Sequence, residues 1–165
     1  MERLTNNYGD VHEEVKKELL SFDIAKNEEC IMYYLEMPWF PGGQFSLFLL
    51  RDILTNHYKV IEKMWDGVND HKRFSTGVYN LDRLCIKIKI TELSNQNRQQ
   101  LENIISDIRY IPSTINRDGY IVLDGVEYEL NIKTKTFEKN YKWRIANENL
   151  ESFTPLIDFV TTQIQ

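Results

Sequence analysis

The sequence contains few of the residues that build disulfide frameworks and metal sites. Its 165 residues include two cysteines, Cys30 and Cys85, and three histidines, His12, His57 and His71. None of them has the close Cys-x-x-Cys or His-x-x-x-His spacing of a zinc site. Both cysteines lie in apolar, strand-like stretches, which favours reduced thiols that pack as small hydrophobes; a disulfide between them is the alternative. We therefore expect no metal and no cofactor.

Long apolar runs and a strong charge bias are also missing. No stretch approaches the roughly 18 apolar residues that a membrane-spanning helix needs, and the first residues lack the apolar core of a signal peptide. The net charge is −5, without the basic patch that nucleic-acid binding requires. We expect a cytoplasmic protein that binds neither a membrane nor a nucleic acid.

Motifs for catalysis are scarce. There is no Gly-x-Ser-x-Gly elbow and no glycine loop that opens a helix to bind phosphate. Asp66, Asp70 and His71 lie close together in a polar stretch. We interpret them as solvated loop residues; a cation site is the alternative. Glu127 and Glu129 share a strand face, which favours solvating charges over a general acid/base pair. We name no catalytic residue and lean away from an enzyme, although a site assembled from distant residues stays open.

A predicted antiparallel meander over residues 118–145 is the clearest local signal. Asp124-Gly125 between two apolar-rich runs is typical of a two-residue hairpin turn. Such a turn places Ile121 opposite Tyr128. Apolar side chains then alternate with polar ones along 126–133, as in a sheet with one solvated face. Residues 141–145 supply the next strand.

The same reasoning assigns the remaining elements. Alternating or doubly apolar patterns predict strands, helical spacing predicts helices, and glycines with polar residues predict a loop. The predicted strands are residues 29–37, 44–51, 58–65 and 84–93, the helices are 10–22, 94–110 and one from 152 or 154, and the loop is 66–80. Asp10 is the predicted N-cap of the first helix. Both faces of 44–51 are apolar, which indicates a strand covered on both sides.

These elements define a single α+β domain over residues 1–165. We predict about seven mainly antiparallel strands, with the helices packed on one face. The halves 29–111 and 118–165 share a faint pattern of alternating strands followed by a helix. Generic hairpin patterning explains this echo, and an internal duplication is the alternative.

Two surfaces are candidates for binding a partner. Aromatic residues make up 12% of the chain, and Trp39 and Phe40 stand beside a Pro-Gly-Gly segment that would hold them as a rigid anchor. The alternative is that they fold back over the core. The second candidate is the outward face of the sheet, where mixed charges either bind a partner or only solvate the surface; its residues are Lys87, Lys89, Glu127, Glu129, Lys142 and Arg144.

The C-terminal part resembles the immunity proteins of bacterial toxin systems. The resemblance covers about the last 45 residues and is carried by a hairpin, a following Tyr-x-Trp strand and a helix after Ser152; the matching residues are Asp124, Gly125, Tyr128, Leu130, Ile132, Tyr141 and Trp143. It implies a cytoplasmic bacterial α+β protein that binds and neutralises a partner toxin, and it assigns no functional residue. The alternatives are a small-ligand-binding or regulatory domain and, third, a small enzyme.

Overall fold

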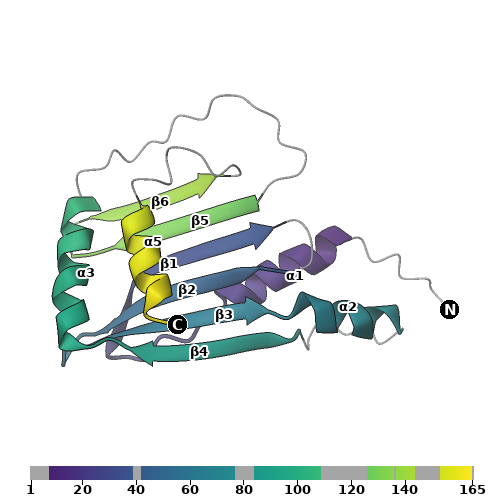
Figure 1. The fold of residues 1–165 in the computed structure, drawn as a ribbon, viewed down its shortest axis with the longest axis horizontal. Coiled ribbons are helices and arrows are strands. Elements are labelled where there is room, and N and C mark those ends of the chain that lie inside the picture. Colours follow the sequence, from purple (N-terminus) through teal and green to yellow (C-terminus); the bar gives the residue numbers. More distant parts are fainter. Residues whose placement is uncertain are drawn as a thin grey trace.

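The computed structural model describes residues 8–38, 42–76, 84–108, 126–135, 137–143 and 153–164. Within them the chain forms six strands and four helices (Figure 1). In chain order the elements are α1 (Tyr8–Leu20), β1 (Glu28–Pro38), β2 (Phe45–Asp52), β3 (Tyr58–Trp65), α2 (Gly67–Ser75), β4 (Ile86–Glu92), α3 (Asn95–Ile108), β5 (Val126–Lys133), β6 (Glu138–Trp143) and α5 (Thr154–Thr162).

The strands form one open sheet in the order β4-β3-β2-β1-β5-β6, and every neighbouring pair is antiparallel. The predicted α+β class and antiparallel sheet are confirmed, with six described strands in place of about seven. The pairing of Ile121 with Tyr128 is wrong, because Tyr128 lies between Glu36 of β1 and Trp143 of β6 and has no free edge. The Asp124-Gly125 turn itself lies outside the described residues.

Helices cover both faces of the sheet, which corrects the prediction that they pack on one face. Figure 1 shows α3 and α5 in front of the strands and α1 behind them. The double coverage explains the composition of β2: Leu47 and Leu49 join the core on the α5 side, whereas Phe48 and Leu50 lie in a cluster on the other side. The prediction that this strand is covered on both sides is therefore confirmed.

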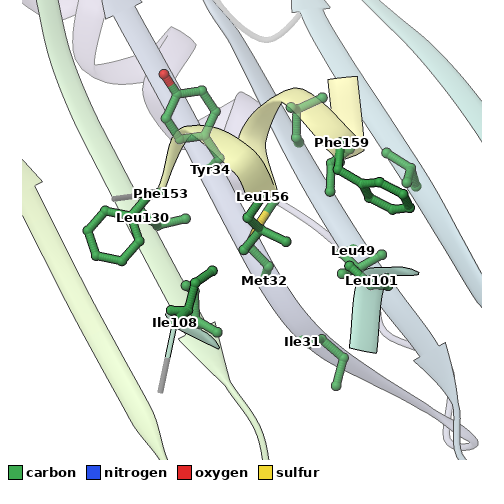
Figure 2. Close-up of a cluster of buried hydrophobic side chains, with 14 of the residues drawn as sticks. Ile31, Met32, Tyr34, Leu49, Leu101, Ile108, Leu130, Phe153, Leu156 and Phe159 are labelled. Atoms are coloured by element: carbon green, nitrogen blue, oxygen red, sulfur yellow. The ribbon is translucent and has the colours of Figure 1, made fainter. Parts of the chain in front are cut away.

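The larger core lies between the sheet and the two helices α3 and α5. Figure 2 shows Leu156 and Phe159 of α5 close to Met32 and Leu49 of the sheet. Met32, Leu49 and Leu156 are fully buried. Burying a side chain of this size contributes roughly 1.5–3 kcal/mol, so this cluster is the main source of stability for the fold. The helical stripe that predicted it contains Leu101 of α3, which is also fully buried.

Helix α1 packs on the opposite face through Val15 and Leu19, which contact a smaller cluster that includes Leu35 and Trp65. The helix begins at Tyr8, so Asp10 lies in its first turn and is not the predicted N-cap. The predicted extension to residue 22 is also wrong. The chain leaves the helix after Leu20, and Phe22 stacks on Phe48 with ring centroids 5.0 Å apart.

The predicted loop at 66–80 contains a helix. α2 begins directly after Asp66, whose side chain accepts a hydrogen bond from the Asn69 amide in the usual N-cap manner. The helix has only nine residues, too few for stability of its own. Asp70 anchors it, because this carboxylate is buried and bound to groups outside the helix. Sequence periodicity does not reveal such an anchor.

Candidate interaction site

The charged residues predicted to share one outward face lie on opposite faces of the sheet. Lys89 is on the α5 side, where its ammonium group donates to the carbonyl of Ile164. Lys87 points the same way because it is two residues along the same strand. Glu129 pairs with Leu35, which packs under α1, and its neighbour in β6 is Lys142. The predicted single charged surface therefore does not exist; Trp39, Phe40 and Arg144 lie outside the described residues.

On the α1 side the charges form an ion-pair cluster. Lys16 of α1 reaches Glu129 at 2.6 Å and also contacts Glu127, while Lys142 reaches Glu129 at 2.8 Å. Only 3% of Glu129 is exposed, so the prediction that it is a solvated outward residue is wrong. Burial raises the pKa of Glu129, but hydrogen bonds and charges from Lys142 and Lys16 outweigh burial and leave the pKa below its ordinary value. The cluster links α1 to β5 and β6.

Lys87 and Lys89 belong to β4, a strand at the edge of the sheet. Lys87 forms an ion pair of 2.7 Å with Asp66, and 72% of its side chain is exposed. β4 pairs with β3 on one side, and no described strand lies on its other side. An open edge of this kind presents backbone donors and acceptors to any extended chain that approaches it.

The register shows which residues of β4 direct their backbone to the open edge. The Leu93 amide donates to the Tyr58 carbonyl at 2.9 Å, and the Asp66 amide donates to the Cys85 carbonyl at 2.8 Å. Hydrogen-bonded pairs alternate with unbonded pairs in an antiparallel ladder. The odd-numbered residues from 85 to 93 are therefore bonded to β3, and Ile88 and Ile90 present their N–H and C=O groups outward.

The side chains of these two isoleucines are also exposed, by 60% for Ile88 and 58% for Ile90. They lie on the α1 face, opposite Lys63 and Ile61 of β3. Ile61 is buried in the cluster formed with Phe48 and Leu50. The sequence predicted that the isoleucines of this strand alternate with the lysines, and they do. It did not predict their exposure, because an alternating pattern does not say whether a strand lies at the centre or the edge.

Neither cysteine has the features of a nucleophile. Both thiols are free. Burial raises the pKa of Cys30 to about 11, and a hydrogen bond with the Asp70 carboxylate is the main cause of a raised pKa at Cys85. A thiol with a raised pKa stays protonated near neutral pH, and the protonated form is a poor nucleophile.

Asp66, Asp70 and His71 do not converge on a cation site. Asp70 instead accepts hydrogen bonds from the Trp65 indole and the Cys85 amide, and Asp66 pairs with Lys87. Among the described residues, no group of three or more His, Cys, Asp or Glu side chains is arranged to hold a metal ion. None of the helices in the described ranges has the length and apolar character needed to cross a membrane.

A small hollow beside α3 is the second candidate site. Its volume is about 250 Å³, and its lining residues are Ile31, Arg51, Tyr58, Glu102, Ile105, Thr134 and Lys135. The guanidinium of Arg51 binds Glu29 at 2.5 Å. Pockets for small molecules are typically roughly 300–1,000 Å³, so this hollow is small by comparison, and three of its lining residues are charged: Arg51, Glu102 and Lys135.

Comparisons of the chain with protein-family models, with curated proteins and with solved structures each find no match.

Proposed function

We propose that this protein is a stoichiometric protein-binding module that inhibits its partner. The observation that carries the proposal is the open edge of β4, where Ile88 and Ile90 expose apolar side chains and outward backbone groups on the same strand. Exposed β-branched residues on an edge strand are a liability for a protein that remains alone, because they promote pairing with other chains. A cognate partner strand would convert this liability into a specific contact.

The second part of the proposal concerns the class of protein that the partner belongs to. The resemblance to immunity proteins suggests a bacterial toxin domain as the partner. Those residues of the resemblance that the structure describes are mainly structural: Tyr128, Leu130, Ile132 and Tyr141 are buried in the core under α5. The resemblance therefore supports a type of fold and a mode of action, stoichiometric inhibition in the cytoplasm, but it points to no contact surface. The β4 edge supplies that surface.

Affinity purification from the native host, with the full chain tagged, tests the proposal. We expect one partner at a fixed molar ratio, and we expect expression of that partner alone to arrest growth. Co-expression of the wild-type chain should restore growth. The matched variant Ile88→Thr/Ile90→Thr keeps β-branched residues on the strand and should protect less well. A captured partner whose activity is unaffected by the protein would contradict the inhibitory function.

A small-ligand-binding domain is the second candidate, favoured by the hollow lined by Arg51 and Lys135. Arg51 is paired with Glu29, and Glu102 also lines the hollow, so Lys135 is the group that would receive a small anion. A thermal-shift screen of phosphates and carboxylates distinguishes this function. A ligand that raises the melting temperature of the wild type, but not of Lys135→Ala, would support it.

A further inference from the structure

Resting on the proposed function, we infer that β4 binds an extended segment of the partner as an added strand, and that this segment alternates β-branched apolar residues with acidic residues. The backbone defines the docking span. The Ile86 amide is occupied by the Leu84 carbonyl at 3.0 Å. Ile88 and Ile90 direct both backbone groups outward, and by the same alternation so does Glu92. An added strand would exchange its main-chain hydrogen bonds with these three residues.

The α1 face of β4 determines the apolar positions of the partner. Residues directly opposite each other in a sheet point to the same side. Partner residues opposite Ile88 and Ile90 would lie beside their exposed side chains, next to the buried Ile61. Apolar β-branched side chains at these positions would extend the row of isoleucines and remove it from water.

The α5 face determines the charged positions. Lys87 and Lys89 lie on this face, and both are exposed. A partner residue between two apolar positions lies opposite Lys89 and points to this side. The Lys89 ammonium group donates to a neutral carbonyl, that of Ile164, whereas the Lys87 ammonium group is already paired with Asp66. Acidic side chains complement this charge, whereas basic ones would oppose it.

The same charges argue against a second copy of this chain as the occupant. A two-fold pairing of β4 with itself must keep each side chain on its own face. Centring it on Ile88 places Lys87 opposite Lys89, and centring it on Lys89 places that lysine opposite its own copy. Centring it on Ile90 avoids the lysine pair but places Ile88 opposite Glu92. Each of these three registers therefore juxtaposes like charges or an apolar side chain with a carboxylate.

Two fluorescein-labelled seven-residue peptides test the inference by fluorescence anisotropy with the full chain. One peptide alternates valine with glutamate and the other alternates valine with lysine. We expect the glutamate peptide to bind at least ten-fold more tightly. In Lys87→Gln/Lys89→Gln the preference should disappear. Equal binding of the two peptides to the wild type, or no binding of the glutamate peptide, would overturn the inference.

Backbone pairing is tested separately from side-chain chemistry. Ile90→Pro removes an amide that points away from β3, so the β3–β4 ladder retains its hydrogen bonds while the outer edge loses a donor. We expect at least a ten-fold loss of peptide binding. If this variant does not fold, the wild-type chain is tested instead with glutamate peptides that are N-methylated at alternate residues. In an added strand only one of the two alternating sets of peptide amides faces β4, so one methylation pattern should abolish binding and the other should leave it; undiminished binding of both methylated peptides would contradict strand addition.

The test also separates this inference from the proposed function. A partner inhibited equally by the wild type and Ile90→Pro would leave the proposed function standing and overturn the β4 edge as its site. Peptide binding as expected, without any inhibited partner, would support a strand-accepting edge and contradict the inhibitory function. A wild-type dimer in light scattering that becomes a monomer in Ile90→Pro would identify a second copy as the occupant and overturn the inference.

Discussion

The indole N–H of Trp65 donates a hydrogen bond of 2.7 Å to the carboxylate of Asp70, and both residues are buried. The same carboxylate oxygen accepts the Cys85 amide at 2.8 Å, and the other oxygen pairs with Arg73 at 2.9 Å. One side chain thus joins the end of β3, the helix α2 and the chain that leads into β4. It holds the edge strand from its N-terminal side.

Asp70→Ala should lower the free energy of unfolding by about 3 kcal/mol, because the buried Trp65 and Cys85 donors lose their acceptor. Urea denaturation followed by tryptophan fluorescence measures the change. Asp107 is exposed on α3, so Asp107→Ala is the control, with an expected change within about 0.5 kcal/mol. Equal stability of the two variants would mean that Asp70 does not anchor α2.

Lys63 attaches the C-terminal end of α1 to the sheet. It is 7% exposed, and its ammonium group donates to the Glu18 carbonyl at 2.6 Å and to the Ser21 carbonyl. Lys63→Met keeps the aliphatic stem but leaves these acceptors without a cation at the helix C-terminus, so we expect a loss of about 2 kcal/mol. Lys72→Met on the exposed side of α2 should change stability little. Hydrogen exchange of α1 amides locates the effect; faster exchange confined to other elements would contradict it.

Glu129 should make the stability dependent on pH. Its pKa is below the ordinary value in the folded protein, so the unfolded chain binds a proton more readily. The contribution is present above the unfolded pKa and is lost as the pH falls through the folded pKa. At neutral pH we expect Glu129→Gln to be about 2 kcal/mol less stable than the wild type.

In urea titrations taken from pH 6 down to pH 3, this difference should hold until the pH nears the unfolded pKa of glutamate, about 4.3, and shrink below it. The control is Glu102→Gln, which removes one partner of a solvent-exposed ion pair with Arg98 and should cost at most about 1 kcal/mol. A wild-type advantage that stays constant over this range would rule out titration of Glu129 as its source.

The role of Trp39 and Phe40 as an anchor for a partner stays a prediction. If they anchor the partner, Trp39→Ala/Phe40→Ala should weaken binding of the captured partner at least ten-fold and change the free energy of unfolding by less than about 0.5 kcal/mol. Phe22→Ala removes a ring that stacks on Phe48 and serves as the control for lost core packing. A melting temperature as low as that of the control would assign Trp39 and Phe40 to the core.

Local sequence patterns predict much of the secondary structure. β3 begins and ends where its alternation predicts, at Tyr58 and Trp65. α5 begins at Thr154 with Pro155 in its first turn, where a missing amide costs no helical hydrogen bond. α2 was missed because its anchor, Asp70, acts through contacts outside the helix.

The candidate site was harder to predict from the sequence than the secondary structure. The sequence points to the lysines of β4 as surface charges, but it does not show that Glu129 and Lys142 lie on the opposite face of the sheet. The alternation of Ile88 and Ile90 with these lysines was predictable, but the exposure of the isoleucines was not. Their exposure depends on β4 being the last strand beside β3, and strand order is a property of the whole chain.

The sequence by itself determined the α+β class, most of the strands and helices, and which side chains alternate along each strand. These depend on periodicity and local backbone preferences, which act over a few residues. Only the tertiary structure decided that β5 pairs with β1, that α1 lies on the other face from α5, that Glu129 is buried and that β4 has no described strand on its outer side. These depend on contacts between distant segments, where burial of apolar surface and pairing of charges are settled together.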